Sequence, residues 1–336
     1  MSAVLVTHAD EPLGRRVVKT LFHDPQVERV LAVGAGAAPR AFERFLAARP
    51  ARLAWSPADL ARHRDVSGLF HGALVRELHI DRVVHLPQHA ASEGGAPVVA
   101  GIPPRTAEAR LVLQHCLEVP AIRHLVALGS AFVYRLAPGN ANRVTEQSEL
   151  DLDPDVPADL RSWIDCDMLF HAEVGHERLR VVLLRVPTVV ATGGAVYLNP
   201  LLEGPPRPRV RPLGFDPLCA LISDKDVAKG IQSAVLGRGR GVFNLAGREA
   251  LPLSQLASWT RRPCLPVPGA ALRALARGLR LVGDPRTAAA LDVPQLRHGF
   301  TLDTARAERE LGFRPRYRIG LSRAGDGTRR LETSPA

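Results

Sequence analysis

Residues 3–22 read AVLVTHADEPLGRRVVKTLF, and the order of elements in this stretch decides the fold. The apolar run 3–6 is typical of a buried strand, a turn closes at Gly14, and residues 15–22 have the spacing of a helix. A second apolar run follows at 30–33. This strand–helix–strand opening has the spacing of a unit that binds a dinucleotide.

The same alternation continues along more than half of the chain. Further strands are predicted at 52–55, 82–86, 122–128 and 179–186, with helices at 69–78, 106–117 and 161–174. Such a pattern predicts an α/β fold: a Rossmann-like doubly wound parallel sheet with helices on both faces. We expect residues 1–190 to form this nucleotide-binding domain. We expect 191–320 to form a smaller C-terminal α/β substrate lobe with strands that return to the main domain, and 321–336 a disordered tail.

The composition excludes several classes of partner. The formal net charge is +10, but the arginines are scattered and aromatic residues make up only 5% of the chain, so we expect no nucleic-acid partner. No apolar run approaches the roughly 18 residues that span a bilayer, so we expect no membrane contact and a cytoplasmic protein. The four cysteines are far apart, and no histidines pair at ligand spacing, so we expect neither disulfides nor a metal site.

Seven short phrases occur in a fixed order along nearly the whole chain. They are 5–7 with 13–14, 83–86, 130–134, 184–187, 226–228, 243–247 and 310–315. In this order they resemble the NAD-dependent epimerase/dehydratase branch of the extended short-chain dehydrogenases/reductases. The resemblance implies NAD or NADP as cofactor, a nucleotide or sugar nucleotide as small-molecule ligand, and a homodimer through the helices near 106–117 and 161–174.

The cofactor turn departs from that family. Its pattern is T-G-x-x-G-x-x-G, whereas residues 7–14 read THADEPLG and keep only the last glycine. His8 adds bulk, and Glu11 places a carboxylate where a diphosphate would lie; the alternative is that Asp10 or Glu11 caps the helix. No acidic residue follows the second strand, which favours NADP over NAD if a dinucleotide binds at all. The resemblance assigns cofactor contacts to Thr7, Leu13, Gly14, Arg40, Leu86 and Pro187.

The catalytic pair of the family is absent. The chain has three lysines, Lys19, Lys225 and Lys229, and none follows a tyrosine by four residues. Hydride transfer in this family depends on a phenol whose pKa is lowered by a nearby ammonium group. The family serine alone is retained, as Ser130.

The helix expected to carry the missing pair offers only carboxylates. In the most natural register, Trp163 or Ile164 replaces the tyrosine, and Asp167 or Met168 replaces the lysine. Asp165 and Asp167 are candidates for a replacement acid/base. The alternative is that these carboxylates lie on a solvated helix face.

The resemblance also places substrate contacts in the second lobe, at Tyr197, Asn199, Arg207 and Arg209. The arginines can pair with a diphosphate, and the alternative is an extended solvated loop. Our hypothesis is a degenerate member of the family, a pseudoenzyme that serves as a nucleotide or sugar-nucleotide binding or regulatory module. The alternatives are an active epimerase, dehydratase or reductase with a non-standard acid/base, and a structural partner that forms a heterodimer with an active homologue.

Overall fold

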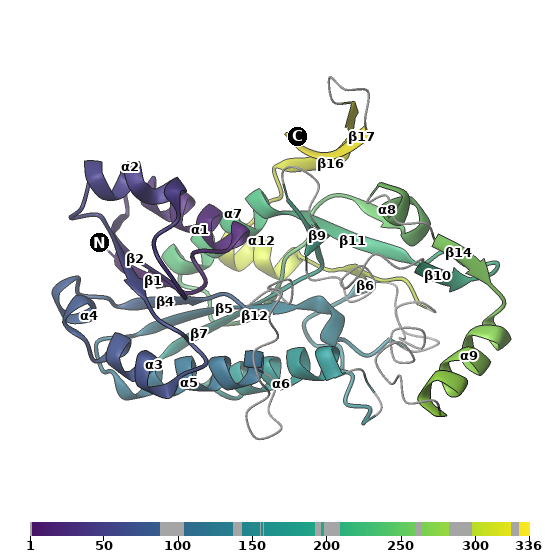
Figure 1. Ribbon diagram of the computed structural model, residues 1–336, viewed down its shortest axis with the longest axis horizontal. Helices are drawn as coiled ribbons and strands as arrows, with labels where there is room; N and C mark the ends of the chain where they lie inside the picture. The colour runs from purple at the N-terminus through teal and green to yellow at the C-terminus, as the bar shows by residue number, and fades with distance from the viewer. Residues whose placement is uncertain are drawn as a thin grey trace.

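Seven parallel strands form the main sheet of the computed structural model, in the order β12-β7-β5-β4-β1-β2-β3 (Figure 1). The structure describes residues 2–87, 104–136, 143–154, 156, 158–191, 196–197, 209–259, 264–281, 298–323 and 329–336. The strands are β1 Ser2–Val6, β2 Val27–Gly34, β3 Leu53–Pro57, β4 Arg82–His85, β5 His124–Ser130, β7 Arg180–Val186 and β12 Gly241–Asn244. The order reverses between β1 and β4, which confirms the predicted doubly wound, Rossmann-like sheet.

Helices cover both faces of this sheet (Figure 1). One face carries α3 His63–Phe70, α5 Pro104–Glu118 and α6 Ala158–Ala172, with α4 Ala73–Glu77 beside them; the other carries α1 Pro12–Phe22, α2 Arg40–Ala48, α7 Asp224–Leu236 and α12 Ala305–Leu311. Alternate residues of β1 point to opposite faces, so Val4 and Val6 join one core while Leu5 joins the other. The sheet is therefore buried on both sides, as a parallel sheet must be.

A second lobe follows β7. Its described residues form the four-stranded sheet β13-β11-β8-β9, the pair β10-β14, and the helices α8 and α9. The bounds are β8 Thr188–Val190, β9 Val196–Tyr197, β10 Arg209–Pro212, β11 Leu218–Ser223, β13 Ala250–Pro252, α8 Leu253–Trp259, β14 Cys264–Val267 and α9 Gly269–Leu281. Short elements elsewhere in the described chain are the turn η1 Ala131–Val133 and the paired strands β6 Arg143–Val144 and β15 Thr301–Leu302. Although β12, α7 and α12 come later in the chain than β8, they pack in the main domain.

The end of the chain differs from the disordered tail that we expected. Strands β16 Tyr317–Arg323 and β17 Arg329–Pro335 pair in antiparallel fashion (Figure 1). Alternation places Ile319 on the inner face, where it joins a small core in the second lobe, and the Lys225 ammonium group donates to the carbonyl of Thr333 at 3.3 Å. Asp226 accepts the backbone N–H groups of Arg316 and Tyr317 at 2.8 and 3.2 Å, which fixes the start of β16. Among the described helices, none is long and apolar enough to cross a membrane.

Candidate functional site

A histidine in the left-handed conformation closes the turn after β1. His8 has φ +47°, a region that a side chain with a Cβ occupies at a penalty of about 1–2 kcal/mol. Its ring is buried and reaches across to α5, where Nε2 lies 3.0 Å from Oε2 of the buried Glu108. The imidazole therefore lies at the carboxyl end of β1. In the T-G-x-x-G-x-x-G pattern this position is a glycine, which has no side chain.

Opposing effects act on the pKa of His8. Burial lowers it, but the hydrogen bond and charge of Glu108, with the nearby charges of Glu11 and Asp10, raise it further, so the net pKa lies above 6.5. His85, 6.4 Å away between ring centroids, behaves oppositely: burial and the charge of His8 lower its pKa to about 3. One imidazole of this neighbouring pair is thus stabilised as a cation, and the other stays neutral.

We expect the His8–Glu108 pair to stabilise the fold most at acidic pH. Because the folded-state pKa of His8 lies above its unfolded value, its contribution is complete below about pH 6.5 and is lost as the pH rises through the folded-state pKa. Urea unfolding should show that Glu108→Gln destabilises the protein by about 1 kcal/mol more at pH 6 than at pH 8.5. The lowered pKa of His85 makes its own contribution to stability change with pH in the opposite direction, but this contribution is present in both proteins and cancels in the difference between them. A difference in unfolding free energy that does not change with pH would contradict the assignment.

The carboxylates that follow His8 do not cap α1. Glu11 is the N-cap residue, Pro12 follows it, and the Glu11 side chain makes no capping hydrogen bond to the helix. Asp10 instead accepts the N–H of Ala35 at 3.2 Å through Oδ2, which ties the turn to the end of β2. The interpretation that Asp10 or Glu11 caps the helix is therefore wrong, and an anionic side chain lies between the first turn and the second strand.

The retained glycine of the turn serves a close packing contact. A Cβ on Gly14 would lie 2.0 Å from the carbonyl oxygen of His8 and 2.8 Å from the Cα of Ala9. Real Cβ atoms do not approach backbone this closely, so α1 can pack on the turn only with glycine here. The close packing contact alone is sufficient to require a glycine at this position.

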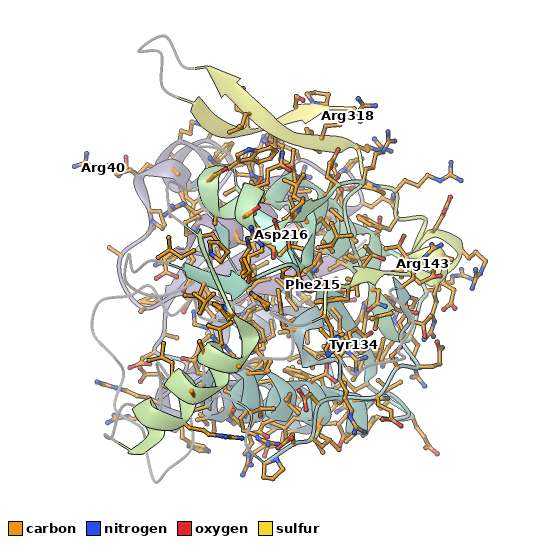
Figure 2. The ribbon with its side chains drawn as sticks, turned by 90° about the vertical axis from the view of Figure 1, so that its right-hand side faces the viewer. Arg40, Tyr134, Arg143, Phe215, Asp216 and Arg318 are labelled. Carbon is orange, nitrogen blue, oxygen red and sulfur yellow. The ribbon has the colours of Figure 1, made fainter. Side chains whose placement is uncertain are left out.

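The predicted cofactor residues gather at the carboxyl ends of the main strands. Thr7 follows β1 and accepts the N–H of Leu86 at 2.9 Å, which joins the ends of β1 and β4. Leu13 and Gly14 lie in the first turn of α1, and Pro187 is buried directly after β7. Arg40, the first residue of α2, is exposed and projects from the periphery in Figure 2.

Ser130 is the last residue of β5 and is buried. Its hydroxyl oxygen accepts the N–H of Phe132 at 3.2 Å, a local bond that caps the short turn η1. On α6, Trp163 and Ile164 are buried in the apolar core. The guanidinium group of Arg105 lies 4.0 Å from the centroid of the Trp163 ring, a cation–π contact. Neither Trp163 nor Ile164 can act as a general acid or base toward Ser130.

Asp167 forms a buried ion pair with Arg185 of β7. Nε and Nη2 of the guanidinium donate to the two carboxylate oxygens, each at 2.7 Å, and both side chains are 1% exposed. The same guanidinium lies 4.8 Å from the ring centroid of Tyr134, whose hydroxyl donates to Asn244 at 2.6 Å and whose pKa is raised to about 12 by burial. Asp167 thus lies in the protein interior and not on a solvated helix face, and both of its carboxylate oxygens accept hydrogen bonds from Arg185.

Asp165 lies on the other side of α6. A helix advances about 100° per residue, so Asp165 is roughly 200° from Trp163 and 160° from Asp167. Those two residues are buried, whereas Met168 and Ala172, which share the side of Asp165, are exposed. Helix geometry therefore directs the Asp165 carboxylate away from Ser130.

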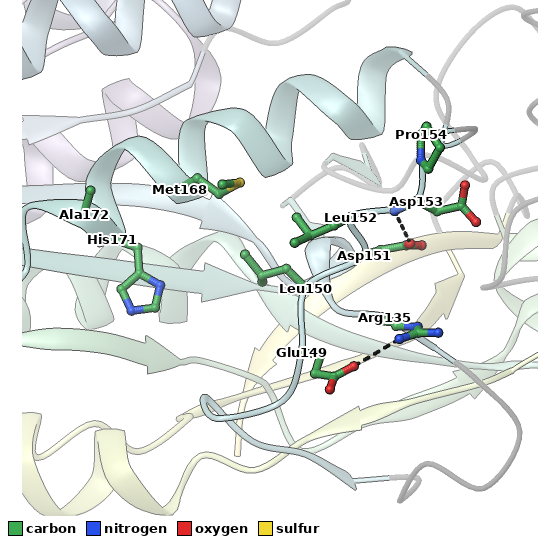
Figure 3. A pocket seen from close by; sticks show the side chains of 10 residues that line it. All are labelled: Arg135, Glu149, Leu150, Asp151, Leu152, Asp153, Pro154, Met168, His171 and Ala172. Carbon is green, nitrogen blue, oxygen red and sulfur yellow. Dashed lines mark hydrogen bonds and ion pairs between the residues drawn. The ribbon is translucent and has the colours of Figure 1, made fainter.

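One pocket among the described residues lies away from the carboxyl ends of the strands. It measures about 750 Å³ and lies between the outer side of α6 and residues 149–154 (Figure 3). Two exposed apolar side chains line it: Leu152 is 56% and Met168 48% exposed. No sequence pattern predicted this pocket, because residues 137–157 have the composition of a surface loop.

The predicted substrate residues are only partly described. Tyr197 lies on β9 and Arg209 on β10, two strands of the second lobe. Asn199 and Arg207 lie outside the described residues. The described part of the lobe places these two strands in different sheets, with β9 paired to β8 and β10 paired to β14.

Sequence comparisons find relatives without an assigned activity. No family model matches the chain. Proteins of Mycobacterium bovis and Mycobacterium tuberculosis, described only as uncharacterized, are 26% identical over 318 residues, which cover 94% of this chain and 80% of theirs.

Solved structures share the fold at low identity. A dTDP-glucose 4,6-dehydratase of Bacillus anthracis in complex with NAD is 14% identical with a TM-score of 0.62, covering 94% of this chain and 92% of its own. A UDP-glucose 4-epimerase of Bifidobacterium longum, in complex with NAD⁺ and UDP, is 16% identical with a TM-score of 0.62, at 94% and 93% coverage. A UDP-glucuronic acid 4-epimerase of Bacillus cereus, in complex with UDP-glucuronic acid and NAD, is 16% identical with a TM-score of 0.60, at 93% and 94%. The fold of this chain is thus the fold of sugar-nucleotide epimerases and dehydratases.

Proposed function

We propose that this chain is a cytoplasmic, non-catalytic binding or regulatory module for a nucleotide or sugar nucleotide, built on the fold of an NAD-dependent epimerase/dehydratase. The observation that carries the proposal is the buried Asp167–Arg185 ion pair beside the apolar residues Trp163 and Ile164. The related enzymes need a phenol and an ammonium group on this helix, and the sequence holds no such pair. Ser130 alone cannot exchange the proton that hydride transfer requires.

The first turn supports a ligand other than an extended dinucleotide. The pyrophosphate of a dinucleotide would approach the N-terminus of α1 through a glycine-lined turn. Here the His8 side chain spans that turn to Glu108, and the Asp10 carboxylate adds negative charge beside it. Two of the fold neighbours named above, the two epimerases, hold UDP or a UDP-sugar in addition to NAD, which supports a sugar nucleotide as the ligand class.

Ligand-induced thermal stabilisation tests the proposal directly. The purified full chain is heated with NAD, NADH, NADP and NADPH, and separately with UDP-, GDP- and TDP-sugars. A nucleotide at about 100 times its dissociation constant should raise Tm by several degrees. We expect a shift with a sugar nucleotide and no change in nicotinamide absorbance. Turnover of NAD(P)H that is lost in Ser130→Ala would replace this proposal with the active-enzyme alternative.

Opening the first turn should restore dinucleotide binding. The triple substitution His8→Gly, Glu11→Gly and Glu108→Leu removes the bulky side chain, the carboxylate and the buried acid that would otherwise lose its partner. We expect its affinity for NADH, measured by isothermal titration calorimetry, to exceed that of the wild type by at least about tenfold, or about 1.4 kcal/mol. Glu108→Leu alone is the control, because the His8 side chain then stays in place. Equal affinity in wild type and triple variant would mean that the turn does not exclude the cofactor.

The outer side of α6 supports a second candidate function, that of a structural partner. Met168 and Leu152 expose apolar surface beside one another at the pocket of Figure 3. A homodimer, or a heterodimer with an active homologue, through α5 and α6 would cover these side chains. Light scattering of the wild type and of Met168→Glu separates the candidates, since a dimer through this face should weaken in the variant.

A further inference from the structure

Three histidines and one glutamate gather between the ends of α3 and α5, outside the site described above. His63 begins α3 and His71 directly follows it, while His115 and Glu118 lie one turn apart at the end of α5. Ligand atoms of His71, His115 and Glu118 all lie within 4.8 Å of one another. Oε2 of Glu118 lies 2.9 Å from Nδ1 of His115 and 3.8 Å from Nε2 of His71.

His115 is buried without a full set of hydrogen bonds. The residue is 2% exposed, and within the described part of the chain its Nε2 has no hydrogen-bond partner, while its Nδ1 has only the contact with Glu118 at 2.9 Å. Its ring stacks on Phe70 at 5.6 Å and faces the rings of His71 and His63 at 5.3 and 5.6 Å. A buried polar group without a partner destabilises a fold unless a ligand satisfies it.

We propose that His71, His115 and Glu118 bind one divalent transition-metal ion, with Zn²⁺ as the best match. Tetrahedral coordination with metal–ligand distances of 2.0–2.2 Å needs donor atoms about 3.3–3.5 Å apart. The two separations from Oε2 of Glu118, 2.9 and 3.8 Å, lie on either side of that value. Two imidazoles and a carboxylate are a common zinc set, with water or His63 in the fourth position.

The surroundings of the cluster fit metal binding. Gln114 donates to Oε1 of Glu118 at 2.7 Å, which orients the carboxylate and leaves Oε2 directed at the histidines.

The location indicates a structural ion. The end of α5 lies at the edge of the sheet where the strands begin, since β5 follows it at His124, and His71 at the end of α3 lies beside it. Ligands of doubly wound folds bind at the opposite edge, outside the carboxyl ends of the strands. An ion at this cluster would therefore join α3 to α5 and would take no part in nucleotide binding.

Titration of the full chain with ZnCl₂ after chelator treatment tests the proposal. We expect one ion per chain by calorimetry and a rise in Tm of several degrees at saturation. His71→Ala and Glu118→Gln change exposed side chains, and each should weaken Zn²⁺ binding by at least about tenfold. His171→Ala, an exposed histidine on α6, is the matched control and should leave the affinity unchanged. Co²⁺ should give the visible absorption bands of tetrahedral coordination.

Two results would overturn the site. One is the absence of binding below about 100 µM Zn²⁺, far weaker than structural zinc sites. The other is equal affinity in wild type, His71→Ala and Glu118→Gln, which would place the ion elsewhere on the chain. The titration contains no nucleotide, so its outcome leaves the proposed function untouched.

Discussion

Replacing Asp167 by alanine will lower the free energy of unfolding by about 3–5 kcal/mol, the loss expected when one partner of a buried ion pair is removed. The Arg185 guanidinium would keep its charge in the interior without the two hydrogen bonds at 2.7 Å that now satisfy it. Burial lowers the pKa of Arg185, but the hydrogen bonds and charge of Asp167, with a contribution from Tyr134, more than offset burial and raise the net pKa. Urea unfolding followed by circular dichroism measures the change.

Two further variants separate structure from chemistry in this region. Asp165→Asn, on the outer side of α6, should change stability by less than about 0.5 kcal/mol. The double change Asp167→Leu with Arg185→Met removes both charges and should recover most of the stability lost in Asp167→Ala. A small loss in Asp167→Ala, comparable to that in Asp165→Asn, would show that the ion pair is not a structural element and would reopen Asp167 as an acid/base.

Gly14→Ala will destabilise the protein by about 3 kcal/mol, although alanine favours a helix over glycine by about 1 kcal/mol. The added methyl would lie 2.0 Å from the His8 carbonyl, and backbone on both sides must move to admit it. Thermal and urea unfolding report the loss.

Gly68→Ala is the matched control for this substitution. Gly68 lies inside α3, and a Cβ there meets nothing within 4 Å, so propensity alone acts and stability should rise by about 0.5–1 kcal/mol. The two alanine substitutions should therefore have opposite signs. If Gly14→Ala and Gly68→Ala changed stability equally, α1 would pack less closely on the first turn than the 2.0 Å between an added Cβ and the His8 carbonyl oxygen implies.

Periodicity predicted the main sheet, because each of its strands is an apolar run between turns or helices. The sequence also predicted which residues lie at the carboxyl ends of the strands, Thr7 and Ser130 among them. It could not predict their partners: His8 and Glu108 are 100 positions apart, and no local pattern connects them. The residue type at position 167 does not indicate whether its side chain is solvated or buried, and only the fold brings Arg185 into contact with it.

The second lobe and the chain end were predicted less well for a related reason. Strands of two to four residues, such as β9 and β13, are too short to show a period. The terminal hairpin contains charged residues throughout, and its burial depends on Ile319 meeting a core that forms elsewhere in the chain. The histidine cluster is likewise divided between two helices, 44 positions apart at His71 and His115 by their numbering.

The contact between His8 and Glu108 has a consequence for descent. Neither residue of this pair can be replaced alone without passing through a less stable chain, because His8→Gly leaves a buried carboxylate without its partner and loss of Glu108 leaves the buried imidazole without its own. Each residue thus makes replacement of the other unfavourable. Homologues should therefore carry the two residues together or lack both.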